Sequence, residues 1–598
     1  MKKVSIFCVF FLIACGGGST PNPSEDNFEI FATGLNLSGF SFDKQNISLS
    51  SDNNNCRYRV NNDDLIHLSS TNNRDFSFRN PIIYSNSENF DLLLSTIPTG
   101  NCMSASKIIS MTVNKFPTQY DAFPANIPDL STNYYKVNDI GFGGIVITDR
   151  FSATICYPTA NDCETWENTL FGQDAHNMTT GDFNGDGFED FVVAWALFPH
   201  TIEKDQKVNA PINIYLNDKS GRFKEDLSIY NSGEAPTHPF AYRLLVEDFN
   251  NDGFDDLFGG SMGIQYRGQD YSQNYINPYP HLLMLSNSNG KLVESSSNII
   301  DDNDGKGMLC GFAHDASAGD PDNDGDIDIY ACNVLLINDG IGNFSIHPYI
   351  NFNWQINNQY GNPMSSLMVD LNNDDYDDLV FWNFDNRQFW SDADEGYILL
   401  SNGSADIQSW KKVVLPPGPF GENKNKYNHA ASEDFNNDGF KDVVVAVTRD
   451  DPYYEGAYIQ VLINDGTGKL FDETSSRFPN QFRADKHHGE GNIYTRDMNN
   501  DSYIDIIHST RDYESGYHGA HIAINDGYGN FISVANADLP YRPDSGGNLY
   551  DMLMKGLPIN ADNSECLDLI SVTDVGWGDN EEDTRNYLFT LINLECYQ

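Results

Sequence analysis

Basic residues are scarce in this chain of 598 residues. Lys and Arg together number 36 against 86 Asp and Glu, which gives a formal charge of −50 at pH 7. A surface of that sign repels nucleic acids and anionic lipid headgroups, so we expect neither as a partner. Part of the acidic excess would serve solubility, but its regular placement along the chain favours a protein that gathers cations.

Long hydrophobic runs are also lacking beyond the N-terminus, where MKKVSIFCVFFLIACGGGS has the basic and apolar segments of an export signal. LIAC at 12–15 resembles the lipobox of bacterial lipoproteins, which implies removal of a signal peptide over 1–14. It also implies lipidation of Cys15 and a tether over 15–27. We therefore expect a cell-envelope protein attached to the membrane only by its lipid. Gly16 favours the outer membrane if the cell is Gram-negative.

Cysteine is infrequent, and no pair has the CxxC spacing of zinc or redox sites. Of 10 cysteines, eight remain after signal removal and lipidation of Cys15. An even number in an oxidising compartment suggests four disulfides, although the sequence leaves their connectivity open. The simplest arrangement joins nearest neighbours: Cys56–Cys102, Cys156–Cys163, Cys310–Cys332 and Cys566–Cys596.

One acidic loop recurs along the chain. In GDFNGDGFEDFVV at 181–193, Asp and Asn alternate, a glycine follows, and another carboxylate precedes an apolar run. Six nearly complete nine-residue copies, at separations of 50 to 72 residues, begin at Asp182, Asp248, Asp320, Asp370, Asp434 and Asp497. An eroded seventh copy begins at Asn560. A unit that recurs at this period indicates a propeller, a solenoid or an array.

The sequence around each loop predicts four short strands. One strand precedes the loop and another follows it; a third, about twenty residues later, ends in an Asn-Asp-Gly or Asp-Gly hairpin turn. No comparable segment has helical periodicity. Four strands repeated seven times predict a seven-bladed β-propeller over 134–598. The last repeat lacks its fourth strand, and we expect the segment 144–157 to supply it and so remove an exposed edge.

The N-terminal part has a different pattern. Residues 28–116 alternate polar and apolar side chains between Asn/Ser turns, which predicts a small antiparallel β-sandwich. Residues 117–133 contain several prolines and are interpreted as a linker. The expected fold class is therefore all-β, with a small β-sandwich domain preceding the seven-bladed β-propeller.

The repeated loop and its downstream strand carry a family resemblance. The pattern D-x-[ND]-x-D-G-x-x-D, followed by LINDGxGxF, resembles the FG-GAP/VCBS repeats of integrin α-chain propellers and of many bacterial surface proteins. The resemblance covers residues 175–598. It implies a propeller whose calcium loops join the first and second strands of each blade, and it implies a binding or adhesion role.

The chemistry of the loop also points to calcium, a hard cation that takes about six to eight oxygen ligands. Side chains at positions 1, 3, 5 and 9 and the carbonyl at position 7 would supply oxygens, while glycine at position 6 permits a positive φ. We expect about six sites. The candidate ligands are Asp182, Asn184, Asp186, Phe188, Asp190, Asp248, Asn250, Asp252, Phe254, Asp256, Asp320, Asp322, Asp324, Asp326, Asp328, Asp370, Asn372, Asp374, Tyr376, Asp378, Asp434, Asn436, Asp438, Phe440, Asp442, Asp497, Asn499, Asp501, Tyr503 and Asp505.

An EF-hand is excluded, because strands flank the loop and no copy has the required glutamate at position 12. Solvated Asp/Asn turns without metal are the alternative. That alternative gains weight in the copies at Asp370 and Asp497, where Asp375 and Ser502 replace the glycine, and the copy at Asn560 is doubtful. We expect the ions to stabilise the fold rather than to catalyse, because the loop would nearly fill their coordination sphere.

A partner would bind on the face opposite the calcium loops. The segments entering each first strand carry histidines, and loops on that face combine aromatic, acidic and arginine side chains, which suits a sugar ring. The candidate residues are His176, His314, His429, His488, Arg449, Tyr453, Arg511, Tyr517 and Trp577. The alternative is that the histidines only form hydrogen bonds between blades.

No GxSxG, HExxH or P-loop motif is present, nor a GxGxxG between a strand and a helix. We therefore expect a monomeric binding or adhesion module for a carbohydrate or protein partner rather than an enzyme. A propeller-type polysaccharide lyase or hydrolase acting through a His/Arg/Tyr face is the alternative, and converging titratable groups would favour it. A purely structural surface protein is a third possibility.

Overall fold

The computed structural model shows an all-β chain. It describes residues 45–48, 57–60, 63–65, 75–78, 89–97, 106–112, 118–122, 136–140, 144–148, 152–157, 162–167, 175–196, 209–267, 274–300, 307–349, 363–383, 395–421, 424–452, 455–479, 481, 484–488, 491–498, 502–510, 520–533, 555–559, 567–574 and 587–594. Helix in these residues is limited to single turns: η2 (Leu227–Ile229), η3 (Ser296–Asn298), η4 (Ile407–Ser409) and α1 (Thr474–Arg477). None of them is long and apolar enough to cross a membrane.

The chain divides into two compact units. The first comprises residues 1–118 with 537–539 and 595–598, and the second comprises 119–536 with 540–594. In the first unit, a four-stranded antiparallel sheet has the order β3-β2-β5-β6, and a separate pair joins β1 to β4. The strands are β1 (Gln45–Ser48), β2 (Arg57–Val60), β3 (Asp63–Leu65), β4 (Asp75–Phe78), β5 (Asn89–Ile97) and β6 (Ser106–Thr112).

In the part of the second unit that the structure describes, eight sheets each contain a path of four strands, and three of them carry a fifth strand. In order they are β8 (Lys136–Asp139), β9 (Ile145–Thr148), β10 (Ser152–Tyr157) and β11 (Asp162–Glu167); β12 (Ala175–Gly181), β13 (Asp190–Ala196), β14 (Ala210–Asn217) and β15 (Phe223–Glu225); β17 (Ala241–Glu247), β18 (Asp256–Ser261), β22 (Leu282–Ser286) and β23 (Leu292–Glu294); β26 (Ala316–Gly319), β27 (Asp328–Ala331), β28 (Val334–Asn338) and β29 (Phe344–Pro348); β30 (Pro363–Val369), β31 (Asp378–Asn383), β32 (Gly396–Leu400) and β33 (Lys411–Val414); β34 (Asn425–Glu433), β35 (Asp442–Arg449), β36 (Glu455–Asn464) and β37 (Leu470–Asp472); β39 (Gly491–Arg496), β40 (Asp505–Thr510), β41 (Ala520–Asn525) and β42 (Phe531–Ser533); and β43 (Lys555–Ile559), β44 (Asp568–Asp574), β45 (Tyr587–Leu594) and β7 (Thr118–Ala122).

Short strands supplement these sheets at their margins. β16 pairs with β14, β38 pairs with β36, and β24 runs parallel to β29, whereas β19–β20 and β21–β25 form separate two-stranded ladders. Their bounds are β16 (Thr237–His238), β19 (Ile264–Arg267), β20 (Asn274–Asn277), β21 (Tyr279–Pro280), β24 (Ile299–Ile300), β25 (Leu309–Cys310) and β38 (Ala484–His488).

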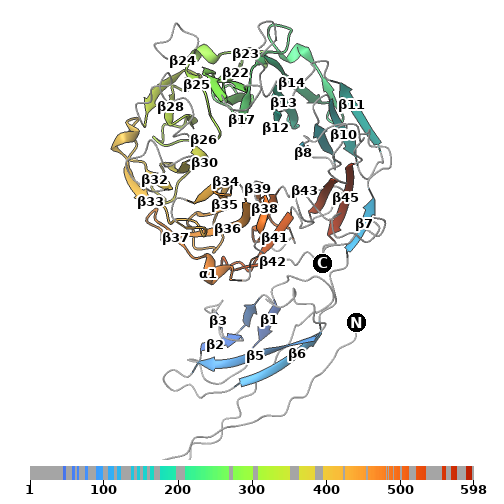
Figure 1. Ribbon diagram of the computed structural model, residues 1–598, viewed down its shortest axis with the longest axis vertical. Coiled ribbons are helices and arrows are strands. Elements are labelled where there is room, and N and C mark those ends of the chain that lie inside the picture. Colours follow the sequence, from blue (N-terminus) through green and yellow to red (C-terminus); the bar gives the residue numbers. More distant parts are fainter. Residues whose placement is uncertain are drawn as a thin grey trace, which may run out of the picture. The chain divides into compact units, whose positions relative to one another are not determined.

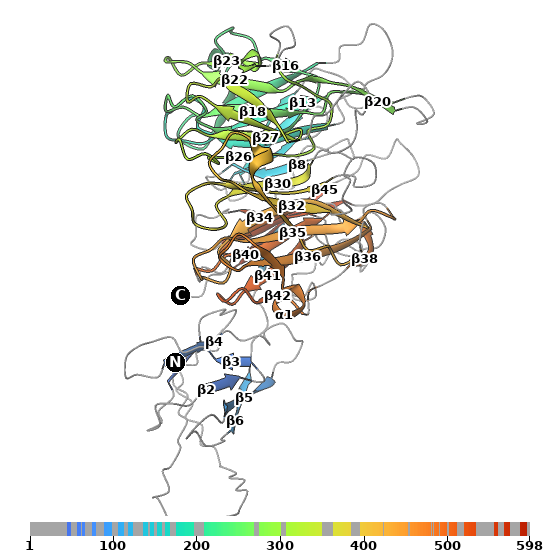
Figure 2. The same cartoon turned by 90° about the vertical axis from the view of Figure 1, so that its left-hand side faces the viewer.

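The eight sheets of the second unit follow one another around a ring, with the first strand of each nearest the centre (Figure 1). Contacts between successive sheets close the ring, because β43 of the last sheet contacts β8 of the first. Within a sheet the strands lie side by side, as β34, β35 and β36 do in Figure 2. The sequence-based expectation of four short strands around each acidic loop therefore holds for all six near-complete copies.

Two expectations about the ring were wrong. The sequence predicts seven sheets, but residues 136–167 form an additional one, which period counting missed because this segment has no acidic loop. The segment 144–157 therefore belongs to its own sheet and does not complete the last one. That role falls to β7, which lies within the expected linker and pairs with β45. An N-terminal strand thus completes the C-terminal sheet, as predicted, but from a different position.

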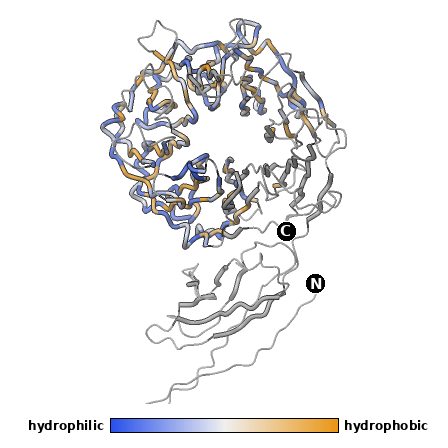
Figure 3. Tube along the Cα trace, viewed as in Figure 1, coloured by the Kyte–Doolittle hydropathy of each residue, from blue (hydrophilic) through white to orange (hydrophobic). Residues whose placement is uncertain are grey.

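The hydrophobic core of the ring lies between neighbouring sheets. The second strands are rich in apolar residues, as in β13, whose seven residues are all buried. Both faces of such a strand are covered, so Val192 packs toward the following sheet and Val193 toward the preceding one. Separate clusters of this kind fill the interfaces between successive sheets from the first to the seventh. Hydrophobic and hydrophilic stretches consequently alternate along the coloured part of the ring in Figure 3.

Candidate functional site

Each of the six acidic loops joins the first and second strands of its sheet. The opening aspartate follows the first strand, and the aspartate at position 9 is the first residue of the second strand, as in β13, β18, β27, β31, β35 and β40. The repeated sequence therefore places equivalent side chains at one end of six consecutive sheets. This is the arrangement that the spacing of the motif predicts.

Hydrogen bonds within the loop fix its curvature in the same way in each copy. In the loop at Asp248, the opening carboxylate accepts the N–H of Asp252 (3.0 Å) and of Gly253 (2.8 Å). Asp252 in turn accepts the N–H of Phe254 at 3.2 Å. Equivalent bonds recur in the loops at Asp182, Asp320, Asp370 and Asp434, and the Ser502 N–H donates to Asp497 at 2.6 Å. These hydrogen bonds wrap the backbone of each loop around its opening carboxylate.

Position 6 requires a left-handed backbone. Gly253 has a φ of 89°, and the glycines of the three other copies that have one adopt similar values. The two substituted copies adopt the same region, with φ values of 68° at Asp375 and 70° at Ser502. A side chain makes this region costly, so these two loops keep the shape of the others at the expense of local strain.

The aspartate at position 9 is buried in every copy. Its Oδ1 accepts a backbone N–H from the hairpin between the third and fourth strands, as Asp256 does from Ser286 at 2.6 Å and Asp442 from Asn464 at 2.9 Å. In four copies the other oxygen, Oδ2, is buried without a hydrogen-bond partner: Asp190, Asp256, Asp328 and Asp442. A buried carboxylate oxygen of this kind is destabilising unless a donor or a cation reaches it.

The pKa values of these aspartates also show the cost of burying a charged carboxylate. Burial raises the pKa of Asp256 to about 7; the Ser286 hydrogen bonds lower it, and the nearby carboxylates of Asp252 and Asp248 raise it further. Burial likewise raises the pKa of Asp328 to about 8 and those of Asp190, Asp378 and Asp442 to about 7. A divalent cation would remove this penalty, because it favours the charged form of every carboxylate around it.

Oxygen atoms at position 3 add to the cation-binding character of the loops. Asn184 Oδ1, Asn250 Oδ1 and Asp322 Oδ1 are buried without a partner. In the loop at Asp320, the carboxylates of Asp320, Asp322 and Asp324 lie within 4.8 Å of one another. An all-oxygen set from carboxylates and amides in a flexible loop suits calcium better than magnesium, which retains more water. These residues therefore fit the ion that the sequence predicts, and calcium ligation stays a prediction.

Contacts between neighbouring loops were missed in the sequence. The position-8 carboxylate of one loop accepts the N–H of the opening aspartate of the preceding loop, from Asp182 to Asp255 (2.6 Å) and from Asp320 to Asp377 (2.8 Å). The position-4 asparagine reaches forward, and Asn251 Nδ2 donates to Asp326 Oδ1 at 2.7 Å. The recurrence of Asn or Gly at position 4 was the available signal, because both residues tolerate the positive φ found there.

The two described candidate histidines lie between sheets. His429 Nδ1 accepts the N–H of Ile493 at 3.2 Å, which connects β34 to β39. His314 packs against Tyr242 with ring centroids 5.3 Å apart, and the backbone of Met364 is its hydrogen-bond partner. Burial lowers the pKa of His314 to about 4 and that of His429 to about 3, so both are neutral at pH 7. These contacts match the structural alternative considered for the histidines.

Buried ion pairs accompany these histidines at the first strands. Arg243 Nε lies 3.0 Å from Asp315 Oδ1, and Asp315 also accepts hydrogen bonds from the backbone and side chain of Ser366. Three consecutive sheets are tied together in this way. Lys426 and Asp450 form a second pair at 3.2 Å, with both side chains largely buried.

The remaining partner-binding candidates are described only in part. Arg449 ends β35, and its guanidinium lies over the Phe420 ring, 4.3 Å from the centroid. His176 and His488 belong to β12 and β38, but their side chains are not described. The other predicted positions that lie outside the described residues are Cys15, Tyr453, Asn499, Asp501, Arg511, Tyr517, Trp577 and the loop at 560–566.

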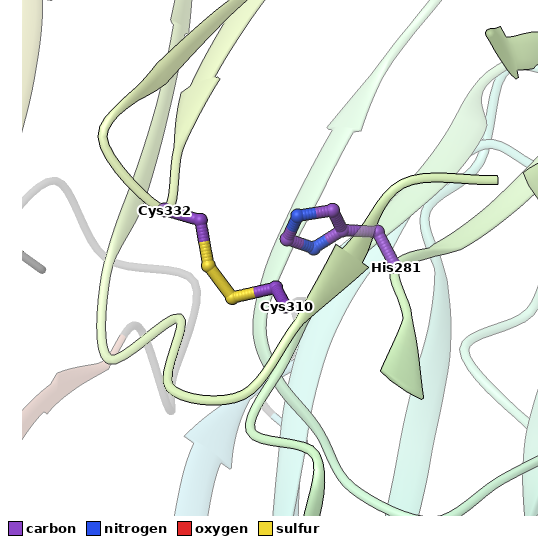
Figure 4. A group of neighbouring side chains, drawn as sticks. All are labelled: His281, Cys310 and Cys332. Carbon is purple, nitrogen blue, oxygen red and sulfur yellow. A yellow bond between two sulfur atoms is a disulfide. The ribbon is translucent and has the colours of Figure 1, made fainter. Parts of the chain in front are cut away.

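Two of the four predicted disulfides fall within the described residues, and both are confirmed: Cys156–Cys163 and Cys310–Cys332. His281 lies beside the second disulfide, and the three side chains converge (Figure 4). This trio is unsuited to metal. The sulfurs are bonded to each other, and His281 Nδ1 accepts the Ser261 N–H at 3.1 Å. Nε2 therefore carries the proton of the neutral ring and has no lone pair for a metal.

Comparison with known proteins agrees with the repeat structure. The FG-GAP-like repeat family matches residues 182–259 and 434–508, which include the loops at Asp182, Asp248, Asp434 and Asp497. The chain carries FG-GAP-like repeats. No curated protein sequence matches the chain.

Several solved structures resemble this chain at low identity. The rhamnogalacturonan lyase PL11 of Bacillus licheniformis is 12% identical, with a TM-score of 0.40 over 91% of this chain and 87% of that one. The V. cholerae biofilm matrix protein Bap1 is 11% identical, with a TM-score of 0.28 over 84% and 83%. The NanB sialidase of Streptococcus pneumoniae is 10% identical, with a TM-score of 0.29 over 87% and 85%. Likenesses of this degree assign no activity to the chain.

Proposed function

We propose that this protein is a calcium-stabilised binding module of the cell envelope. One observation carries the calcium assignment. Four closing aspartates, Asp190, Asp256, Asp328 and Asp442, each bury a carboxylate oxygen that makes no hydrogen bond. Carboxylates of the same loop surround each of these oxygens. The 36 lysines and arginines of the chain balance fewer than half of its 86 acidic residues, which leaves a formal charge of −50.

The architecture we propose for the second unit is a β-propeller of eight blades. Its support is the ring of four-stranded sheets, the first strands at the centre and the apolar clusters between successive sheets. Calcium loops at one end of the blades would neutralise carboxylates that otherwise repel one another. For residues 28–116 we retain the proposal of a small β-sandwich, which the two separate sheets of that unit support.

The location we propose is outside the cytoplasm, with the lipid on Cys15 as the membrane anchor. The support is the N-terminal sequence pattern together with the pairing of Cys156 with Cys163 and of Cys310 with Cys332, which suits an oxidising compartment. The lipid would hold the folded units at the membrane surface through the tether over 15–27.

The partner we propose is a carbohydrate or a protein, bound away from the calcium loops. Arg449 and Phe420 supply a cation stacked on an aromatic ring near the end of β35, opposite to the end where the calcium loop enters. The lyase or hydrolase alternative needs an ionisable base among the central histidines. His314 and His429 are buried and engaged between sheets, so they do not favour it.

Thermal melting of the full-length protein with and without EDTA tests the calcium proposal. A ligand at 100 times its dissociation constant stabilises the folded state by about 2.7 kcal/mol per site. With several loops contributing, we expect EDTA to lower the melting temperature by about 10 °C. Added calcium should restore it, and magnesium at the same concentration should restore less. An unchanged melting temperature would contradict the proposal.

A binding screen tests the partner proposal separately. The calcium-loaded protein would be applied to an array of acidic and neutral glycans, with Arg449→Ala as the matched variant. Because Arg449 stacks on Phe420 away from the loops, we expect the variant to keep its calcium-dependent melting and to lose about tenfold in affinity for the selected glycan. Equal binding by both proteins would remove this surface from consideration.

A further inference from the structure

The acidic loops share one backbone frame over the residues that the structure describes, but their closing aspartates differ. In the loops at Asp182, Asp248, Asp320 and Asp434, the position-9 Oδ2 has no partner. In the loop at Asp370, the same atom of Asp378 accepts the N–H of Leu371 at 3.2 Å. In the loop at Asp497, Asp505 Oδ2 accepts the N–H of Met498 at 2.9 Å. The position-2 backbone thus supplies in two copies the donor that Asp256, Asp328 and Asp442 lack, and Phe183 approaches Asp190 in the same way without completing a hydrogen bond to Oδ2.

Position 3 divides the loops further. Asn184, Asn250 and Asp322 have an unpartnered Oδ1, so the loops at Asp182, Asp248 and Asp320 each offer two buried oxygens in need of a partner. In the loop at Asp434, Asn436 Oδ1 accepts the N–H of Asp438 at 2.9 Å, which leaves only the oxygen of Asp442. In the loop at Asp370, Asn372 Oδ1 accepts the N–H of Asp374 at 3.0 Å.

The loop at Asp320 illustrates the cause. Its position 2 is Pro321, which has no N–H, so the backbone donor that Asp378 receives from Leu371 cannot exist there. Asp322 also replaces the asparagine of the other copies at position 3, which adds a carboxylate. The loop at Asp320 thus carries five aspartates, as many as the loop at Asp370, but it lacks the position-2 donor that serves Asp378.

We propose, on the basis of the calcium function proposed above, that the six loops form two classes. Those at Asp182, Asp248, Asp320 and Asp434 bind calcium, with the one at Asp434 the weakest because it offers a single unpartnered oxygen. Those at Asp370 and Asp497 keep their shape through hydrogen bonds and bind none at concentrations that fill the others. A cation gains most at a buried oxygen without a donor, because binding there removes the cost of an unsatisfied acceptor.

In the loop at Asp182 a lysine supplies part of the missing charge. Lys219 Nζ lies 3.5 Å from Asp186 Oδ2, and the side chain is more than half exposed. An exposed lysine is easily displaced, because its ion pair is worth little in water. The loops at Asp248 and Asp320 therefore rank above the loop at Asp182 in affinity.

A matched pair of substitutions tests the division. Asp442→Asn and Asp378→Asn alter the same position in two adjacent sheets, and both aspartates are fully buried. Each full-length protein would be stripped with EDTA and titrated with calcium by equilibrium dialysis, with the ions bound per chain counted against the unaltered protein. We expect Asp442→Asn to bind one ion fewer and Asp378→Asn to bind the same number. Ions bound elsewhere in the chain cancel in this comparison.

Melting in calcium-free buffer provides a second readout. Asp378→Asn should be destabilised with and without calcium, because it loses the acceptor for the Leu371 N–H. Asp442→Asn should match or exceed the unaltered protein without calcium, because it removes an unsatisfied buried carboxylate. If Asp378→Asn does not fold, Asp505→Asn takes its place.

The outcomes separate the two proposals. If both variants lose an ion, or neither does, the division into classes is wrong while calcium binding stands. If the unaltered protein binds no calcium, the proposed function itself fails. One ion lost by Asp442→Asn alone supports the division.

Discussion

The acidic loops and the first strands of the ring differ in how their buried carboxylates are neutralised. Both bury carboxylates, but Asp315 at the first strands is held by Arg243 and by Ser366, whereas Asp256 at the loops keeps an oxygen without a protein partner. Two of the scarce basic residues, Arg243 and Lys426, thus pair with carboxylates in the interior of the ring. In the proposed function, an ion from outside would neutralise the loops. Stability should therefore depend on calcium at one place and on internal pairing at the other.

Breaking an internal pair should produce the largest single-residue effect. Arg243→Met leaves Asp315, whose side chain is 7% exposed, without its cation. Loss of one partner of a buried pair costs about 3 to 5 kcal/mol of unfolding free energy, and we expect the lower end because the Arg243 side chain is 35% exposed. Urea unfolding in saturating calcium measures it, and the double variant Arg243→Met/Asp315→Asn should recover part of the loss. A change below about 0.5 kcal/mol in the single variant would show that the pair is not part of the stabilising core.

Acid should destabilise the folded protein through its buried histidines. The folded-state pKa of His429 is lowered to about 3 by burial and by the nearby Arg243. Between these two pKa values the His429 side chain binds a proton in the unfolded chain but not in the folded one. The free energy of unfolding therefore falls as the pH decreases from about 6.5 toward 3. At pH 4.5 the loss attributable to His429 should reach about 2.7 kcal/mol.

His429→Asn isolates this effect. Asparagine can still accept the Ile493 N–H but does not ionise, so the variant should lose less stability between pH 6.5 and 4.5 than the unaltered protein. The comparison is made in EDTA, since the raised pKa values of the loop aspartates act in the opposite direction and are the same in both proteins. Parallel pH profiles would rule out His429 as the source.

The smallest effect concerns backbone strain in the loop at Asp370. Asp375 has a φ of 68°, which glycine adopts freely. Asp375→Gly should therefore raise the unfolding free energy by about 1 kcal/mol, partly offset by the greater freedom of the unfolded chain. The same substitution should leave the calcium count unchanged, because Leu371 still donates to Asp378. A gain of an ion would show that the residue at position 6, and not the position-2 donor, separates the loops.

The sequence was most informative where a local motif repeats. The Asp-rich frame, the positive φ at position 6 and the placement of each loop between two strands all follow from nine consecutive residues. The pairing of Cys310 with Cys332 was predicted for a similar reason, since the two lie within one sheet-forming period. The position-2 N–H donates a hydrogen bond to Asp378 but not to Asp442. This difference depends on small shifts of the backbone at position 2, which no residue pattern except Pro321 reveals.

The errors arose where the motif is missing or the pairing is distant. Residues 136–167 form a sheet without the acidic loop, so counting loops underestimated the ring by one. β7 is a five-residue strand in a proline-containing segment, and its partner β45 lies at the far end of the chain. Pairing over such a distance is set by closure of the ring, which local sequence does not encode.

The joining of β7 to β45 has a consequence for the order of folding. Residues 118–122 are made early, but their sheet cannot be completed until residues 587–594 have emerged. The intermediate sheets can form from neighbouring strands as the chain grows, whereas the final sheet waits for its last strand. During that interval β7 is an unpaired strand, and a protein exported as an extended chain would form this longest-range contact only at the end of its passage.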